Sequence, residues 1–387
     1  MRILVSGGWG YGNIGDDAIL DATVRLLGSK YPESETVWTS YDQRLTIEAS
    51  VGVNSPILSA HRILVGTRAF GYMQSIGRCV PSALWPKIPR RFYERLLKRH
   101  VERIASQRDL ARNTKALAVL ESNFASADVV IMSGGGYFNQ WPSMFAARIR
   151  ELEMAHRAGC KVLLIGQSIG PFTEDQKVVL KSTLRASDCI IVRDQDSVNE
   201  VHALGFEAQL APDLAMGFPS DVPCKKGMLT LVPAELRADQ ERLLIHSIAD
   251  VARNNNWRVT LTLTRLIYPD LATLNRMYKL LHEQGVNAKL IIPKDYHEMR
   301  TVIEGSEWVM SRGLHALILG WRSGSKVFAL TKSRKVDGFL AAIGCASNQC
   351  AESRWNLLGE EFRKLKDVQP PDRRIAIATE VERAFFI

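Results

Sequence analysis

The sequence predicts an α/β protein built from two doubly wound domains that face each other across a cleft. Three observations predict this fold. Short apolar runs alternate with helical patterns, the first run leads through a glycine-rich turn into a helix, and the alternation restarts after an interruption near residue 220. A chain of 387 residues also fits two domains of ordinary size better than one.

The first unit is the apolar run at residues 3–5, followed by the glycine-rich stretch 7–20 and an amphipathic helical pattern. Its turn satisfies the G-x-G-x-x-G pattern of dinucleotide-binding proteins. Asp16 and Asp17 argue against a bound phosphate, because two carboxylates already occupy the first helical turn, where an anion would dock. We therefore interpret the turn as a hydroxyl-binding or catalytic loop. The alternative is that both aspartates only cap the helix.

The remaining strands of the first domain follow the same alternation. After a predicted strand at residues 36–40, a long, basic, helix-prone segment at residues 60–126 interrupts the pattern. Further strands, separated by helices, are predicted at residues 129–132, 162–165 and 189–192, and the pattern closes with residues 210–213.

Residues 217–227, with two prolines and two lysines, form the best domain boundary. The first domain is thus predicted at residues 1–217 with the basic helical insertion 60–126, the second at residues 227–345, and a helical tail at residues 346–387 that packs back on the first domain. Strands of the second domain are predicted at residues 228–232, 258–264, 289–292, 308–310 and 326–330. Two such domains facing across a cleft form the GT-B-like arrangement.

Composition and charge restrict the surroundings of the protein. The chain is 46% apolar and 24% charged, has no apolar run of the ~18 to 20 residues that span a bilayer, and begins without a signal-peptide pattern, so a cytoplasmic location is expected. Its six cysteines lack metal-site spacing, so reduced thiols and no metal site are expected.

The net charge of +9 is concentrated in one segment. Residues 61–115 hold thirteen Lys or Arg side chains against three acidic ones, a local charge of +10, together with several aromatic residues. Such a patch suits an anionic membrane surface, a lipid-linked pyrophosphate or nucleic acid. Of these we predict peripheral contact with the inner face of the plasma membrane or with a lipid-linked acceptor, and not nucleic acid. The alternative is a solvated helical face.

Polar and glycine-rich groups after the predicted strands mark a candidate ligand site. In an open parallel sheet, ligands lie beyond the carboxyl ends of the strands, and glycines there permit close approach of the backbone. Four groups meet this condition: residues 134–136, residues 166–168, Arg193 with Asp194, and Asp213.

The second domain adds the stretch S-R-G-L-H-A-L-I at residues 311–318, between a strand and a helix. Arg312 beside His315 at a helix start suits phosphate or carboxylate, which the guanidinium and backbone amides would bind together. The alternative is a packed, structural histidine.

Together these motifs resemble the polysaccharide pyruvyl transferase family. The chain carries G-N-I-G-D-D, S-G-G-G, G-Q-S-I-G-P, R-D-x-x-S, P-D and the Arg/His motif in the family's order, between residue 7 and about residue 340. K-V-D-G-F, which begins at Lys335, is similar to the family's lysine-containing segment. One departure is that many members have Arg-Leu-His, whereas Gly313 here separates Arg312 from Leu314. The resemblance therefore supports a role for His315 more firmly than one for Arg312.

The resemblance implies transfer of pyruvate from phosphoenolpyruvate to two hydroxyls of a sugar, in a cell-surface polysaccharide or its lipid-linked precursor, to form a cyclic ketal. Phosphoenolpyruvate is then the donor substrate, and no cofactor is required. Arg193, Arg312 and Lys335 are predicted to bind the donor's phosphate and carboxylate. His315 is predicted to be the general acid that protonates the methylene carbon, and Asp16 or Asp17 to orient or deprotonate the sugar hydroxyls. Acceptor binding is predicted for Asn13, Gly15, Gly134, Gly135, Gly136, Gln167 and Ser168.

Two other functions fit the same pattern. A GT-B glycosyltransferase would share the fold and the cleft, but would bind a sugar nucleotide in the second domain. A non-catalytic scaffold of a polysaccharide assembly complex would keep the fold and the basic patch without turnover. The sequence leaves open which sugar and which hydroxyls react, the stereochemistry of the ketal, and the oligomeric state.

Overall fold

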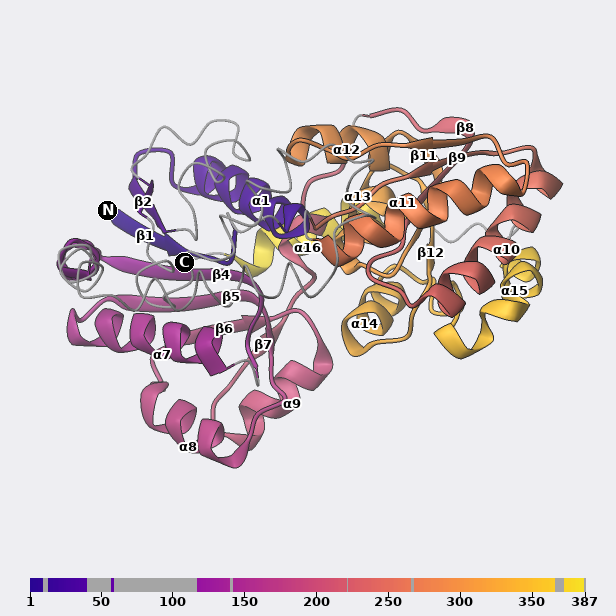
Figure 1. Cartoon of the computed structure of the whole chain (residues 1–387). Coiled ribbons are helices and arrows are strands. Elements are labelled where there is room, and N and C mark those ends of the chain that lie inside the picture. The colour runs from indigo at the N-terminus through magenta and orange to yellow at the C-terminus, as the bar shows by residue number, and fades with distance from the viewer. Residues whose placement is uncertain are drawn as a thin grey trace, which may run out of the picture.

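The computed structural model of the chain contains two parallel β-sheets, each covered by helices (Figure 1). The structure describes residues 1–9, 13–39, 57–58, 117–139, 142–220, 222–265, 268–365 and 372–385. The basic segment 61–115 lies outside these residues, as does most of the predicted insertion 60–126. Among the residues that are described, no helix combines the length and the apolar composition needed to cross a membrane.

The first sheet has seven strands in the order β3-β2-β1-β4-β5-β6-β7. Its strands are β1 (Arg2–Ser6), β2 (Glu35–Thr39), β3 (Ile57–Leu58), β4 (Val129–Phe138), β5 (Lys161–Ile169), β6 (Cys189–Val192) and β7 (Gln209–Leu210). The connecting helices are α1 (Ile14–Lys30), a helix at residues 117–125, α7 (Pro142–Arg157), α8 (Glu174–Thr183), α9 (Gln195–Ala203) and η2 (Leu214–Met216).

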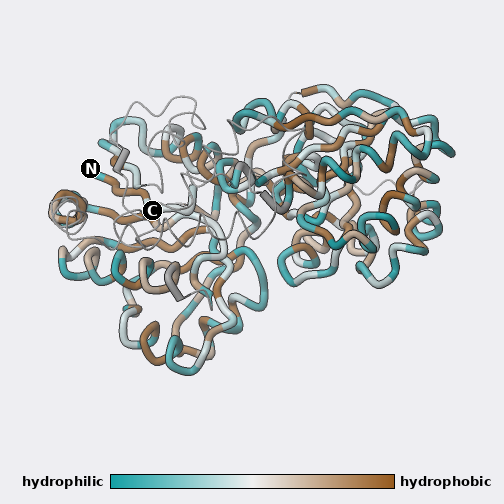
Figure 2. The backbone as a smooth tube through the Cα atoms, viewed as in Figure 1, coloured by the Kyte–Doolittle hydropathy of each residue, from teal (hydrophilic) through white to brown (hydrophobic). Residues whose placement is uncertain are grey.

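Alternate residues of this sheet enter two different cores. Ile3 and Val5 of β1 are buried in a core shared with α1, whereas Leu4 between them is buried in a second core shared with α7. Helices therefore cover both faces, as near-continuous apolar strands of a parallel sheet require. In Figure 2 these central strands are mostly brown, while the outward helical faces are teal.

The second sheet has five parallel strands in the order β10-β9-β8-β11-β12. Its strands are β8 (Lys225–Val232), β9 (Arg258–Leu261), β10 (Ala288–Leu290), β11 (Ser306–Ser311) and β12 (Lys326–Ala329). The helices between and after them are α10 (Ala238–Asn255), α11 (Tyr268–Glu283), α12 (Tyr296–Glu304), α13 (Leu314–Arg322) and α14 (Arg334–Ala342). The predicted α/β architecture with two doubly wound parallel sheets is confirmed.

The prediction that residues 134–136 and 166–168 follow their strands is wrong, because both segments lie inside strands. β4 and β5 continue through them with register shifts after Gly135 and Ile165. Gly134, Gly135 and Gly166 adopt positive φ angles of 50°, 94° and 64°. These conformations suit glycine, and they let each strand bulge without ending.

The two halves of the molecule are packed against each other. The change of sheet falls between the end of β7 at Leu210 and the start of β8 at Lys225. Across it, α1 contacts both α12 and α13, and η2 contacts α1 and α13. One hydrophobic core runs through this contact, since Ile19 of α1, Leu214 of η2 and Leu314 of α13 belong to it. The domain limits themselves remain a prediction.

The C-terminal tail differs from the one predicted, because it divides between the two halves. It contains η3 (Glu352–Leu357), α15 (Leu358–Leu365) and α16 (Arg374–Ala384). α15 packs on α10 of the second half, where Phe362 completes an aromatic cluster with Trp257 and Trp308. α16 lies against first-half elements, with contacts to η2 and an ion pair of 3.0 Å between Glu382 and Lys30 of α1.

Candidate active site

A cavity of about 710 Å³ lies between the two halves. Asn13 and Asp16 at the start of α1 line its first side, with residues from β4, β5 and the end of β6. The second side is lined by residues that follow β8, β9, β11 and β12. The cavity thus lies at the carboxyl ends of strands of both sheets, where ligands bind in open α/β folds. Its volume is within the range of small-molecule sites, about 300 to 1,000 Å³.

His315 and Asp16 meet in this cavity from opposite halves of the molecule. His315 is the second residue of α13, Asp16 is the third residue of α1, and His315 Nδ1 lies 3.5 Å from Asp16 Oδ1. Gly15 makes this approach possible, because a Cβ atom at residue 15 would lie 2.8 Å from His315 Nδ1. Gly15 is buried and does not itself line the cavity, so its predicted role in acceptor binding stays a prediction.

Asp16 is held from its own side of the cavity as well. Its Oδ2 atom accepts hydrogen bonds from the Tyr137 hydroxyl at 2.6 Å and from Asn13 Nδ2 at 2.8 Å. Tyr137 is in turn covered by Arg148, whose guanidinium lies 5.2 Å from the ring centroid. These contacts orient the carboxylate with Oδ1 facing His315, which is the arrangement a catalytic carboxylate needs.

The surroundings of His315 favour its neutral form. Burial is the main cause that lowers its pKa, and the charges of Arg193 and Lys335 lower it further, while Asp16 and Asp213 oppose the change. His315 Nε2 is buried and has no hydrogen-bond partner among the described residues.

Arg312 lines the cavity, but its charge is already paired elsewhere in the second half. It donates to the Glu235 carbonyl at 2.8 Å and to Glu352 Oε1 at 2.9 Å, and its guanidinium lies 6.0 Å from the Trp355 ring centroid. Burial raises the pKa of Glu352, but the hydrogen bond from Arg312 opposes this, and the net pKa is lowered. These partners direct Arg312 toward the C-terminal tail, and its binding to a donor stays a prediction.

Arg193 and Ser168 are brought together in one network at the cavity wall. Arg193 donates to Asp213 Oδ2 at 2.6 Å and to Ser168 Oγ at 2.8 Å, and Ser168 donates to Asp194 Oδ2 at 2.7 Å. Burial raises the pKa of Asp194, but hydrogen bonds from Ser168 and Ser197 outweigh it, and the net pKa is lowered. The network fixes a cation whose charge is partly balanced by Asp213.

Lys335 supplies a second cation, from the first turn of α14. Partial loss of hydration inside the cavity is the main cause that lowers its pKa, followed by the positive charge of Arg193, although its surface stays partly open to solvent. It forms no ion pair with any residue that the structure describes. Its neighbour Arg334 pairs with Asp196 at 2.7 Å and so joins α14 to the start of α9.

Several predicted site residues do not line the cavity. Gln167 is fully buried and donates to the Met132 carbonyl at 2.9 Å, and Asp17 is buried in α1. Gly134 and Gly135 are close-packing positions, since a Cβ atom there would lie 2.2 Å from Ile19 and 2.0 Å from Tyr137. Asn13, Gly136 and Ser168 do line it.

Sequence reasoning missed several residues of the cavity, among them Tyr137, Arg265 and Asp270. Tyr137 follows the glycines of β4 directly, and an aromatic residue after such a run was the available signal. Arg265 follows β9 and binds Asp270 through two hydrogen bonds of 2.9 and 3.0 Å. Burial raises the pKa of Asp270 despite this partner. Arg265 also forms an isolated β-bridge with Asn13, which links the two halves at the cavity rim.

The structure describes no group of three or more His, Cys, Asp or Glu side chains that would hold a metal ion in the ranges given above. Its cysteines at positions 160, 189, 224, 345 and 350 are unpaired thiols.

Comparison with known proteins adds a family and a fold. The profile of the polysaccharide pyruvyl transferase family matches residues 13–331. Among curated proteins, no sequence matches the chain.

Many solved structures share the fold. The UDP-GlcNAc 2-epimerase of Methanocaldococcus jannaschii matches with a TM-score of 0.59 and 12% identity over 99% of this chain and 98% of its own. The Neisseria meningitidis UDP-GlcNAc 2-epimerase, bound to UDP-GlcNAc, matches with a TM-score of 0.55 and 14% identity over 98% and 94%. A Rickettsia africae glycosyltransferase matches with a TM-score of 0.53 and 10% identity over 99% and 92%. At such low identity the likeness shows the fold alone, and the predicted GT-B-like fold is confirmed.

Proposed function

The chain belongs to the polysaccharide pyruvyl transferase family, and from this premise we propose that it transfers pyruvate from phosphoenolpyruvate to two hydroxyls of a sugar and closes a pyruvate ketal. The observation that carries the proposal is the contact of 3.5 Å between His315 and Asp16 across the cavity. Ketal formation needs an acid for the donor and a base for the acceptor, and this contact brings one candidate for each from the two halves.

The donor side of the proposal rests on the cations of the cavity. Phosphoenolpyruvate carries a phosphate and a carboxylate, and Lys335 and Arg193 offer positive charge close to His315. The start of α13 adds backbone amides, and its first turn holds no acidic residue that would repel an anion. Arg312 is a further donor ligand if it exchanges Glu352 for the substrate.

The proposed reaction uses His315 as the acid. Its lowered pKa leaves the imidazole neutral in the free protein, and the incoming phosphate and carboxylate raise that pKa again. Charged His315 then gives the Nε2 proton to the methylene carbon of the donor, which becomes a methyl group. The adjacent carbon becomes electrophilic as its double bond is lost.

Asp16 is the proposed base on the acceptor side. A sugar hydroxyl attacks the electrophilic carbon and loses its proton to Asp16, and the resulting bond is the first C–O bond of the ketal. The C–O bond to phosphate then breaks, and the second hydroxyl closes the ring. One hydroxyl proton replaces the proton given by His315, and the other leaves with phosphate, so the reaction is balanced without a cofactor.

The acceptor side follows from the space that remains. The cavity of about 710 Å³ is larger than the donor alone requires, and Asn13, Tyr137 and Ser168 offer hydrogen-bonding groups for a sugar.

We include in the proposal that the acceptor is lipid-linked and that the basic segment 61–115 contacts an anionic membrane. Neutralising Arg90, Arg91, Lys98 and Arg99 is expected to weaken binding to anionic liposomes, most clearly at low salt. Unchanged binding to the liposomes would indicate that the segment is only a solvated surface and does not contact the membrane.

One experiment tests the function itself. The purified protein is incubated with carbon-labelled phosphoenolpyruvate and a panel of lipid-linked oligosaccharides, and the label in the lipid fraction and the phosphate released are both measured. The proposal predicts that equal amounts of each appear with at least one acceptor. Transfer from a sugar nucleotide instead, with no use of phosphoenolpyruvate, would support the glycosyltransferase alternative, for which the present support is the shared fold alone.

A further inference from the structure

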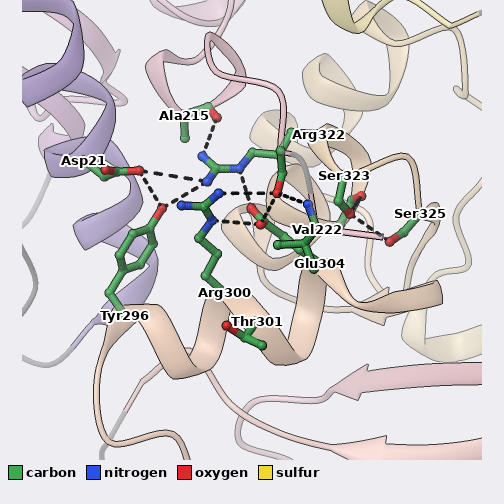
Figure 3. A network of polar contacts seen from close by, with 12 residues as sticks. Asp21, Ala215, Val222, Tyr296, Arg300, Thr301, Glu304, Arg322, Ser323 and Ser325 are labelled. Atoms are coloured by element: carbon green, nitrogen blue, oxygen red, sulfur yellow. Dashed lines mark hydrogen bonds and ion pairs between the residues drawn. The ribbon is translucent and has the colours of Figure 1, made fainter. Parts of the chain in front are cut away.

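A largely buried cluster of charged and polar side chains joins the two halves (Figure 3). Arg322, at the end of α13, has 1% of its side chain exposed and donates from Nε to Glu304 of α12 at 2.6 Å. Arg300 of α12 binds the other oxygen of Glu304 at 2.8 Å. Ser220, in the segment between the sheets, also donates to Glu304.

Tyr296 connects this cluster to the first half. Its hydroxyl donates to Asp21 Oδ2 of α1 at 3.1 Å and accepts from Arg322 at 3.3 Å. Arg322 itself lies 4.0 Å from the same Asp21 oxygen and donates to the carbonyl of Ala215 in η2 at 3.4 Å. Figure 3 shows Asp21 on α1, facing Tyr296 and Arg322 from the other side of the contact.

Stability alone explains this cluster poorly. The attraction within a buried ion pair usually offsets little more than the cost of removing both charges from water. Apolar residues of similar size often give the folded protein equal stability. Charged and hydrogen-bonded groups differ from apolar ones in fixing a single geometry, because each donor must meet its own acceptor. The cluster therefore suits a task in which the relative placement of α1 and α13 matters.

The same two helices carry the catalytic pair. Asp16 precedes Asp21 by five residues on α1, and His315 precedes Arg322 by seven residues on α13. At ~1.5 Å per residue the cluster lies only about 7 to 11 Å along each helix from the contact between Asp16 and His315. Because helices of this length are stiff, a shift between α1 and α13 at the cluster becomes a shift between the two catalytic side chains.

We propose that Tyr296, with Asp21 and Arg322, sets the distance between Asp16 and His315, so that these three are positioning residues of the site. The proposal rests on the proposed function for the use of that distance, but the distance itself is open to measurement without turnover. Tyr296→Phe removes the bridging hydroxyl and keeps the ring, and Asp21→Asn removes the charge with nearly the same shape. Together they remove the bridging hydroxyl and the charge that fix α1 against α12 and α13, while the hydrophobic core between the helices is retained.

The test measures the electrostatic coupling between Asp16 and His315. NMR titration gives the pKa of His315, whose signal among eight histidines is identified by its loss in His315→Gln. Asp16, Asp213, Arg193 and Lys335 all act on this pKa, so a single shift would mix their effects. The change caused by Asp16→Asn isolates the one contact of interest, and we expect it to lower the pKa of His315 by about 1 unit or more in the native background.

In the Tyr296→Phe/Asp21→Asn background we expect the drop caused by Asp16→Asn to shrink to half or less, because the two side chains are no longer held together. The matched control is Glu241→Gln, which removes the charge of a buried carboxylate that pairs with the partly exposed Arg276 between α10 and α11, entirely within the second half. In that background the full drop is expected. An undiminished drop in the double variant, or an equal loss in the control, would overturn the proposal. If the double variant does not fold, Tyr296→Phe alone decides in the same way.

Discussion

Tyr137 donates a hydrogen bond of 2.6 Å to Asp16, and this bond fixes the carboxylate that faces His315. The ring of Tyr137 also fills the space that Gly8 and Gly135 leave open, since a Cβ atom at either glycine would lie within 2.0 Å of it. Four segments distant in the sequence thus meet around one carboxylate: the loop after β1, the start of α1, the glycine-bearing part of β4, and the start of α13.

Tyr137→Phe is expected to lower turnover about tenfold and to leave the affinity for phosphoenolpyruvate unchanged. The ring still fills its space, but Asp16 loses a donor that orients it toward the acceptor. The loss of one hydrogen bond should cost only about 1 kcal/mol of the free energy of unfolding. Steady-state kinetics and calorimetric titration with the donor check both parts. A weaker affinity for phosphoenolpyruvate with normal turnover would contradict this prediction, because Tyr137 would then act in donor binding and not through Asp16 on the acceptor.

Gly15→Ala is expected to reduce turnover strongly in a folded protein. The added methyl group would lie 2.8 Å from His315 Nδ1, so His315 or α13 must move away from Asp16. The loss should be on the order of 10²-fold, the scale of a misplacement of about 1 Å.

Gly28→Ala is the matched control, because it lies in the same helix and a Cβ atom there meets nothing within 4 Å. This variant should keep full activity and gain up to about 1 kcal/mol in stability, as an alanine replaces a glycine inside a helix. Equal activity of the two variants would show that close approach at residue 15 is not needed.

Much of this arrangement could be predicted from the sequence, and the limits are physical. The strands were predictable because buried parallel strands are continuous apolar runs, and the start of α1 and the region of His315 were found through their glycines and charges. The glycines of β4 were wrongly placed beyond the end of the strand, because a bulge inside a strand has the same glycine-rich composition as the segment that ends one. The pairing of Arg312 with Glu352 depends on the docking of the tail, which no local pattern encodes. The contact of Asp21 with Tyr296, 275 residues apart, was hidden for the same reason.

His315 should make the protein sensitive to acid. Its pKa in the folded state is lowered, so between that value and the unfolded value of ~6.5 the unfolded chain binds more protons. The contribution of His315 to stability is then fully present above pH ~6.5 and is lost as the pH falls through this window. As the pH falls from neutral to the acid end of this window, the free energy of unfolding should therefore decrease less for His315→Gln than for the native protein. Urea unfolding at several pH values checks this, and identical pH dependence of both proteins would contradict it.

Binding of phosphoenolpyruvate should take up a proton at His315. The donor's negative charges raise the pKa that burial has lowered, so the imidazole becomes charged when the donor arrives. Calorimetric titration at slightly alkaline pH in buffers of different ionisation enthalpy measures this uptake. We expect close to one proton for the native protein and a clear loss of uptake in His315→Gln. Equal proton uptake by both proteins would show that a group other than His315 binds the proton.

Lys335→Met should weaken donor binding by tenfold or more, with a smaller effect on turnover at saturation. The side chain lines the cavity and, among the described residues, has no ion-pair partner to compete with the donor. Lys332→Met is the control, since Lys332 is exposed nearby and does not line the cavity. Binding titrations with phosphoenolpyruvate should separate the two variants. Equal affinities would exclude Lys335 as a donor ligand.

The most direct test of the account is single-turnover transfer from labelled phosphoenolpyruvate to a competent lipid-linked acceptor, followed by mass spectrometry of the acceptor. We expect the native protein and Gly28→Ala to add the mass of one pyruvate less one water to the acceptor, whereas His315→Gln and Asp16→Asn should bind the donor and form this product at least about 10²-fold more slowly. Formation of the product by both variants at the native rate would contradict the claim that the contact between His315 and Asp16 carries the chemistry.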